Sequence, residues 1–213
     1  MSRSVAVSPE TLAQAASLLR QGGVVAFPTE TYYGLAADPW NTEAVERLYR
    51  IKKRSRQLPV LVLIAGQQQL SQVAASLPAA YQPLIARFWP GPLTLICPAR
   101  SELALLTGGT GTIGVRHSPH PVAAQLLEAF GGPVTATSAN LSGMPAAVSA
   151  VQVERMLSAG VDLILDGGDT PGGSGSTLVG LRGAALYCLR EGKLPFSRIQ
   201  EAYTASFPTS STA

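Results

Sequence analysis

Charged residues are scarce in this sequence: they make up 14% of its 213 residues, well below the roughly 25% of an average domain. The formal net charge of +3 suits an anionic ligand but falls far short of a histone-like nucleic-acid binder. Long hydrophobic runs are also missing, since no apolar stretch approaches the roughly 18 residues of a membrane span. No basic segment precedes an apolar one as in a signal peptide. We therefore expect a cytoplasmic protein with no membrane partner.

Cysteine and histidine are nearly absent, with two of each. Cys97 and Cys188 lie inside apolar runs, where a thiol normally behaves as a small core side chain, so we expect no disulfide. His117 and His120 are not accompanied by a zinc-binding pattern, and we expect no protein-bound metal site. Around Ser174, the Gly-x-Ser-x-Gly motif of serine hydrolases is truncated and lies in a glycine-rich stretch, which argues against a catalytic triad.

Helical and strand patterns alternate along the chain, which predicts an α/β fold. Ser8 is expected to cap a first helix that starts at Pro9 and ends near Gly22. We expect one domain over residues 1–200 and a flexible tail over 201–213. Further helices are predicted at 42–52, 67–76, 81–88, 119–130 and 150–159, and strands at 24–27, 60–64, 93–97, 112–116, 133–137, 161–165, 177–181 and 185–190.

The segment Pro28-Thr-Glu-Thr-Tyr-Tyr-Gly-Leu35 is the most informative polar feature, because it follows an apolar strand directly. Polar groups at a strand exit are typical of a ligand site, although a solvated loop would look similar. Lys52 and Arg54 follow at the end of a predicted helix and combine a point charge with a planar fork, a pair suited to phosphates. The alternative is a pair of cations stabilised by the helix dipole.

Other polar side chains stand at the ends of predicted strands. Ser138 and Asn140 have an i, i+2 spacing that lets both face one ligand, or they form an ordinary turn. Arg116 ends a strand that begins at Thr112 and fits carboxylate or phosphate recognition, but a surface arginine is equally compatible. Residues 176–177 and 190–192 carry similar ambiguity. No single cluster decides the function.

Taken in order, the clusters closely resemble the YrdC family over roughly residues 10–195. The resemblance rests on the segment 28–35, Lys52-x-Arg54, Phe88-Trp-Pro-Gly-Pro-Leu-Thr94, Gly114-Val-Arg116, Ser138-Ala-Asn140 with Ser142-Gly143, Asp166-Gly-Gly168, Ser176-Thr177 and Leu189-Arg-x-Gly192. It implies a twisted mixed sheet with packed helices around a concave basic cleft. It also implies synthesis of L-threonylcarbamoyl-AMP from L-threonine, bicarbonate and ATP, with release of pyrophosphate, for modification of tRNA adenosine 37.

The resemblance also assigns roles to individual residues. Thr31, Arg116 and Ser176 would hold threonine, with Arg116 on its carboxylate. The nucleotide would be held by Lys52, Arg54, Thr112, Ser138, Asn140 and Arg190, and Lys52, Arg54, Ser138 and Asn140 would also be catalytic. Mg²⁺ would arrive with ATP. Downstream threonylcarbamoyl-transfer proteins, and a weak tRNA or RNA contact, are the macromolecular partners implied.

The chain departs from some relatives at Leu58 and Leu63, where longer members carry Asn and His. Those polar contacts must be absent or replaced. At 213 residues, the chain resembles the short bacterial form of the family. Two other functions remain open: an RNA-binding module with the same fold, which a charge of +3 permits, and a diverged paralogue without the activity, which retention of the Lys52 and Ser138 motifs disfavours.

Overall fold

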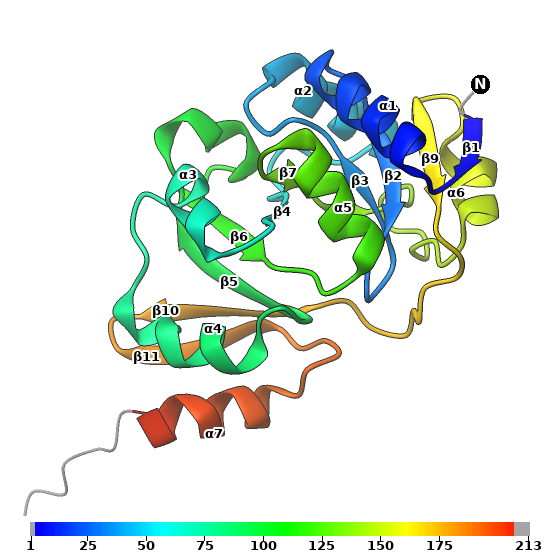
Figure 1. The fold of residues 1–213 in the computed structure, drawn as a ribbon. Coiled ribbons are helices and arrows are strands. Elements are labelled where there is room, and N and C mark those ends of the chain that lie inside the picture. The colour runs from blue at the N-terminus through cyan, green and yellow to red at the C-terminus, as the bar shows by residue number, and fades with distance from the viewer. Residues whose placement is uncertain (1–2, 207–213) are drawn as a thin grey trace, which may run out of the picture.

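The computed structural model describes residues 3–206 of the chain. Two mixed sheets form its centre (Figure 1). The first has the strand order β1-β9-β2-β3-β8 and the second β11-β10-β5-β6-β4-β7. The strands are β1 (Arg3–Ala6), β2 (Val25–Pro28), β3 (Tyr33–Ala36), β4 (Val62–Leu63), β5 (Leu93–Pro98), β6 (Thr112–Arg116), β7 (Val134–Thr135), β8 (Thr137–Ser138), β9 (Leu163–Asp166), β10 (Thr177–Arg182) and β11 (Ala185–Arg190).

Helices cover the sheets. Helices α1 and α5 lie side by side near the first sheet, and α4 contacts α7 beside β10 and β11 (Figure 1). The helices are α1 (Pro9–Arg20), α2 (Thr42–Lys52), α3 (Leu70–Val73), α4 (Gln82–Phe88), α5 (Pro121–Phe130), α6 (Ala150–Leu157) and α7 (Phe196–Ser206), with short 3-10 turns at η1 (Gln67–Gln69), η2 (Ala79–Tyr81) and η3 (Ser101–Leu106). The predicted α/β class is confirmed.

Helix α1 forms as predicted from its cap. The Ser8 hydroxyl accepts a hydrogen bond from Thr11 N at 3.3 Å, and Ser8 N donates to Thr11 Oγ1 at 2.8 Å. This reciprocal pair satisfies two backbone donors at the helix start, and Pro9 supplies a helical φ at the first position. Leu12 and Leu19 then face the core, so capping and burial agree on where the helix lies.

The segment 134–138 links the two sheets. Its first part, β7, pairs with β4 in the second sheet, and its last part, β8, pairs with β3 in the first. Between them, Ala136 N donates to Leu61 O at 2.8 Å. The strand predicted at 133–137 is therefore two short strands, because the chain crosses from one sheet to the other at this point.

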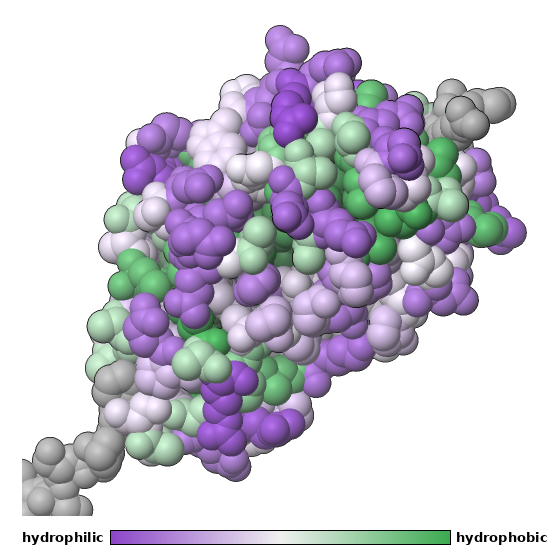
Figure 2. Space-filling view, viewed as in Figure 1, coloured by the Kyte–Doolittle hydropathy of each residue, from purple (hydrophilic) through white to green (hydrophobic). Residues whose placement is uncertain are grey.

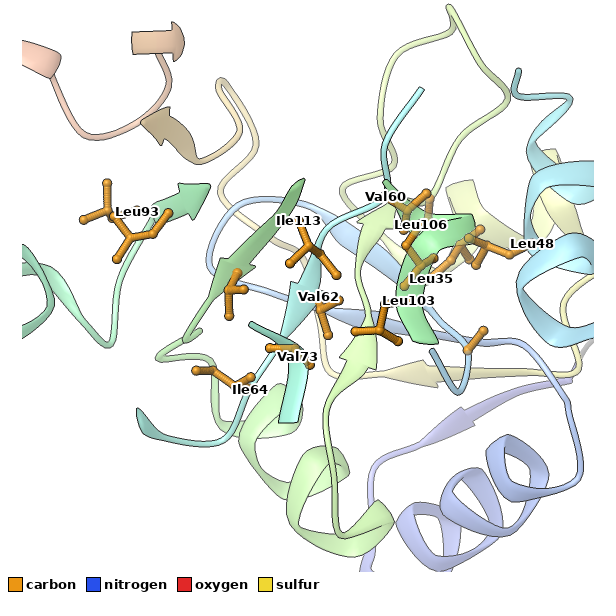
Figure 3. Packing of buried hydrophobic residues seen from close by; sticks show 14 of the residues in the cluster. Leu35, Leu48, Val60, Val62, Ile64, Val73, Leu93, Leu103, Leu106 and Ile113 are labelled. Carbon is orange, nitrogen blue, oxygen red and sulfur yellow. The ribbon is translucent and has the colours of Figure 1, made fainter. Parts of the chain in front are cut away.

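Apolar side chains from both sheets meet in one large core. Figure 3 shows Leu35 of β3, Val62 of β4 and Leu48 of α2 within it, and all three are fully buried. A smaller cluster lies between α1, α5 and the first sheet. Burying several such side chains, at about 1.5 to 3 kcal/mol each, fixes the sheets relative to one another.

Several predicted elements differ from the structure. The helix expected at 67–76 is a 3-10 turn followed by the short α3, and the strand expected at 60–64 is reduced to β4. Strands β1 and β3 were not predicted. Residues 201–206, expected in a flexible tail, belong to α7, whose Ile199 and Ala202 are buried; the rest of that tail lies outside the described residues.

The surface shown in Figure 2 mixes hydrophilic and hydrophobic residues without a continuous apolar band. None of the helices within residues 3–206 has both the length and the apolar character that crossing a membrane requires.

Candidate active site

A cleft of about 580 Å³ is lined by strands of both sheets and by the loops that follow them. Eight of the nine site residues predicted from the sequence line this one cleft; Lys52 is the exception. The eight are Thr31, Arg54, Thr112, Arg116, Ser138, Asn140, Ser176 and Arg190. Residues separated by up to about 160 positions in the chain therefore reach a single site, which is basic as expected: its charged lining is three arginines and Glu191.

Arg116 is the last residue of β6 and lines the cleft. It is 4% exposed, and its Nη1 atom lies 2.5 Å from Glu30 Oε1 and 3.2 Å from Thr31 Oγ1. Burial lowers the pKa of Arg116, and the Glu30 carboxylate acts in the opposite direction. The Nε atom is buried and has no hydrogen-bond partner within the described chain. A buried N–H without a partner destabilises the folded protein, so the Nε donor of this guanidinium is available to a ligand acceptor.

Two hydroxyl pairs lie in the same region. Thr29 Oγ1 and Thr31 Oγ1 are 3.0 Å apart, and Ser176 Oγ is 2.7 Å from Thr94 Oγ1. All four side chains are buried. Thr29 Oγ1 donates its hydrogen to Tyr32 O at 2.7 Å, so Thr31 is the donor within the first pair. One acceptor lone pair of Thr31 and one O–H of the second pair are left for a small polar ligand.

Ser138 and Asn140 form a turn directly after β8. Ser138 Oγ donates to Asn140 Oδ1 at 2.6 Å, and Asn140 Nδ2 donates to Met144 O at 2.5 Å and to Leu141 O at 3.0 Å. The turn predicted as the alternative for these residues is therefore present, and both side chains also line the cleft.

Lys52 lies behind that turn and does not line the cleft. It is 1% exposed, and Nζ donates to Ser138 O, to Asn140 O at 3.0 Å and to Asn140 Oδ1 at 3.1 Å. An ammonium has three donors, and three acceptors occupy them. Burial, and to a smaller extent Arg54, lowers the pKa of Lys52 to about 7, while the three oxygens favour the ammonium. This geometry differs from the phosphate contact we expected, because Lys52 is on the buried face of α2.

Arg54 follows α2 and lines the cleft. Its Nη2 atom donates to Pro59 O at 2.9 Å and its Nε to Leu58 O at 3.4 Å, so the segment after α2 holds the guanidinium in place. Leu58 itself is exposed, whereas Leu63 is buried in the smaller core cluster. Neither leucine lines the cleft, so the positions where some relatives carry polar residues contribute no side-chain contact there.

Arg190 and Thr112 complete the predicted set. Arg190 Nη2 donates to Ser176 O at 2.9 Å, which joins the end of β11 to the segment before β10. Burial lowers the pKa of Arg190. Thr112 Oγ1 lies 2.9 Å from Thr110 Oγ1 at the start of β6.

Sequence reasoning missed some residues of this site. Gly173, Ser174 and Gly175 line the cleft. Leu189 and Glu191, which belong to a sequence motif but had no assigned role, line it beside Arg190. The glycine-rich stretch around Ser174 indicates a loop by its composition, but composition does not place that loop against the cleft. Within residues 3–206, no three His, Cys, Asp or Glu side chains are grouped so that they could hold a metal ion.

The fold and the cleft together define a class: α/β proteins in which two mixed sheets enclose one basic, hydroxyl-rich, ligand-sized cleft. The model of the Sua5/YciO/YrdC family, described as "Telomere recombination", matches residues 17–192. The chain belongs to this family.

Curated relatives carry the name threonylcarbamoyl-AMP synthase. One from Pyrococcus abyssi is 40% identical over 88% of this chain and 55% of its own length, and one from Bacillus subtilis is 40% identical over 89% and 55%. The chain thus spans about half the length of these two relatives. A third, from Halorhodospira halophila, is 41% identical over 75% of this chain and 84% of its own length.

Solved structures agree with the family. P. abyssi Sua5 complexed with L-threonine superposes with a TM-score of 0.89 at 36% identity, covering 95% of this chain and 60% of that one. Escherichia coli YciO superposes with a TM-score of 0.81 at 28% identity, covering 91% and 97% of the two chains. Both structures therefore share the two-sheet fold described above.

Proposed function

We propose that this protein makes L-threonylcarbamoyl-AMP from L-threonine, bicarbonate and ATP, releasing pyrophosphate. The observation that carries the proposal is the gathering of eight residues, from motifs far apart in the chain, around one basic cleft. Family membership supports it, as does the name of a relative that the chain matches over most of that relative's length. A further support is that P. abyssi Sua5, which has the same fold, forms a complex with L-threonine.

Threonine is assigned to the part of the cleft around Arg116. The guanidinium suits an amino-acid carboxylate, since it is planar, buried and retains an unpartnered Nε donor. The Thr31 and Ser176 hydroxyls are the natural partners for the substrate's hydroxyl, because both line the same cleft.

The nucleotide is assigned to the part of the cleft lined by Arg54, Arg190 and the Ser138–Asn140 turn, with Thr112 nearby. The two arginines would neutralise phosphate charge, and the turn and Thr112 would supply neutral hydrogen bonds to the α-phosphate, ribose or base. Lys52 would act through the turn rather than on the phosphates, since its donors are occupied.

The chemistry requires alignment and charge stabilisation more than a protein nucleophile. Bicarbonate and the threonine amine condense to a carbamate with loss of water. A carbamate oxygen then attacks the α-phosphorus of ATP, and the bond to pyrophosphate breaks. Arginines held at the cleft wall stabilise the charge that develops on the phosphoryl oxygens. Mg²⁺ would enter with ATP, since Glu191 is the only carboxylate among the described residues lining the cleft.

Delivery of the threonylcarbamoyl group to tRNA adenosine 37 is assigned to separate transfer proteins, with at most a weak tRNA contact by this chain. A cytoplasmic location is part of the same proposal, because ATP and tRNA are available there.

The deciding experiment measures pyrophosphate release from ATP, omitting L-threonine and bicarbonate in turn. We expect release only when both are present, with threonylcarbamoyl-AMP identified by mass spectrometry. Release that ignores either omission would contradict the proposed reaction. No release under any condition, combined with RNA binding, would favour the RNA-binding module, and no release without RNA binding the diverged paralogue.

A further inference from the structure

Glu30 is a carboxylate placed next to a cleft that is built for anions. It follows β2 in the first sheet and contacts Arg116 at the end of β6 in the second. Its side chain is 14% exposed and does not line the cleft, whereas that of Arg116 does. The acid therefore stands behind the arginine and spans the two sheets.

Both oxygens of the Glu30 carboxylate are engaged. Oε1 accepts from Arg116 Nη1 at 2.5 Å, and Oε2 accepts from Ser118 Oγ. The Glu30 carbonyl accepts from Lys193 Nζ at 2.9 Å. Glu30 thus ties the β2 exit to residues 116–118 and to the chain after β11, and each of these segments contributes to the cleft or follows one that does.

The contacts of Arg116 show what this anchoring achieves. An Nη1 nitrogen carries two hydrogens, and Glu30 and Thr31 accept them. The Nε donor on the other side of the guanidinium has no partner within residues 3–206, and no hydrogen bond of Nη2 is found among them. The protein therefore binds the guanidinium at Nη1 and leaves the Nε–Nη2 edge available. That edge can donate two parallel hydrogen bonds to the two oxygens of a carboxylate.

Charge explains why the anchor is an acid. A buried guanidinium without a counter-ion is strongly unfavourable, and a long arginine side chain has many rotamers. An acceptor that is ionised and held by a second hydrogen bond fixes both the charge and the direction of the fork. A neutral amide would keep the shape but lose the charge-assisted bond.

We propose that Glu30 is a positioning residue for amino-acid recognition: it fixes Arg116 by Nη1, so that the Nε–Nη2 edge meets the substrate carboxylate. This rests on the proposed function, in which Arg116 binds threonine. Ser118 supports the arrangement by holding the second carboxylate oxygen.

The test compares the binding of L-threonine and of ATP, each measured by titration calorimetry. The variants are Glu30→Gln, Glu30→Asp and Ser118→Ala, with Glu154→Gln on the exposed face of α6 as a matched charge control. Glu30→Gln should lower threonine affinity by at least about tenfold and leave ATP affinity within about twofold. Glu30→Asp should lower threonine affinity less than Glu30→Gln, because it keeps the carboxylate charge on a side chain that is one methylene shorter. Ser118→Ala, which keeps the ion pair, should cost less than Glu30→Gln.

A double-mutant cycle with Arg116→Lys separates positioning from general damage. Once the fork is replaced by an ammonium, Glu30→Gln should change threonine affinity by less than about twofold. Wild-type threonine affinity in Glu30→Gln, or equal losses for threonine and ATP, would overturn the inference. If Glu30→Gln does not fold, unchanged threonine affinity in both Glu30→Asp and Ser118→Ala would overturn it. A wild-type protein that binds no threonine would instead contradict the proposed function.

Discussion

At the scale of single residues, Lys52 is a buried cation that lies behind the lining of the cleft and not in it. Its ammonium holds the backbone of Ser138 and Asn140 from behind, and Asn140 then faces the cleft. The spacing of the buried residues Val45, Leu48 and Tyr49 continues to position 52 at helical intervals, so the sequence did place Lys52 on the buried stripe of α2. That periodicity is the signal from which the buried position of Lys52 could have been predicted; its expected phosphate contact stays a prediction.

The role of Lys52 predicts a dependence on the number of phosphates. Lys52→Met should weaken the binding of adenosine, AMP and ATP by a similar factor, because it disturbs the turn and not a charge contact. Arg54→Ala is the matched control, and its loss should grow from adenosine to ATP, because a cation on the phosphates gains with each added charge. Calorimetric titration of the three ligands measures both series. If the loss of affinity in Lys52→Met also grew from adenosine to ATP, as expected for Arg54→Ala, it would support a direct contact between Lys52 and the phosphates.

The buried hydroxyls predict selectivity for threonine over valine. Valine is nearly isosteric but lacks the hydroxyl, so it would lose the hydrogen bond that Thr31 or Ser176 is proposed to make with the substrate. We expect discrimination of at least about a hundredfold against valine, and weaker discrimination against serine, whose missing methyl is worth about 1 to 3 kcal/mol. Adenylate formation at equal concentrations of the three amino acids measures this. Equal rates with threonine and valine would show that the hydroxyl is not read.

At the scale of elements, the predictions succeed where a local signal acts alone. Helix α1 has its cap, its first-turn proline and its apolar face within about 15 residues, and α2 likewise matches its predicted bounds. Strand β3 was missed because it is stabilised by pairing with β2 and β8, which its own residues do not reveal. One of these partners, β8, is about 100 residues away in the chain. Its residues read locally as a polar loop with a glycine.

The candidate site shows the same difference between local signals, which the sequence reveals, and long-range contacts, which it does not. The motif residues could be named from the sequence, because strand ends and residue types are local features. Thr94 and Glu30 gained no role, since their partners Ser176 and Arg116 are 82 and 86 positions away. The motif at 88–94 contributes to packing through Trp89, which is in the core with Nε1 donating to Leu93 O at 2.7 Å and does not line the cleft.

The cleft-lining segment 175–176 lies in close backbone contact with Gly192. A Cβ there would lie 2.2 Å from Gly175 O and 2.6 Å from the carbonyl carbon of Ser176. Gly192→Ala must therefore displace the 175–176 segment, and we expect a loss of about 1 to 3 kcal/mol in the free energy of unfolding together with weaker threonine binding. Gly132→Ala is the control, since the nearest atom to its Cβ is 3.7 Å away. Unfolding curves and threonine titrations that agree for the two variants would contradict this.

At the scale of the whole molecule, the cleft couples the two sheets. Its walls come from β3 and β8 of the first sheet and from β5, β6 and β10 of the second, and the large core also draws on both. A ligand that binds between the sheets therefore stabilises their association. In the folded protein this should be visible as a change in global stability and not only in the mobility of a loop.

This coupling predicts a single thermal transition that ATP shifts. At ATP concentrations about a hundred times its dissociation constant, binding adds about 2.7 kcal/mol, which for a chain of this size raises the melting temperature by roughly 5 to 10 °C. The Ser138→Ala/Asn140→Ala variant should melt lower without ligand, because Asn140 also bonds Met144 O, and should show little shift with ATP. Ser142→Ala, exposed in the same turn, should shift like the wild type. Two transitions, only one of which responds to ATP, would contradict the single domain predicted for residues 1–200, because they would mean that the two sheets unfold independently.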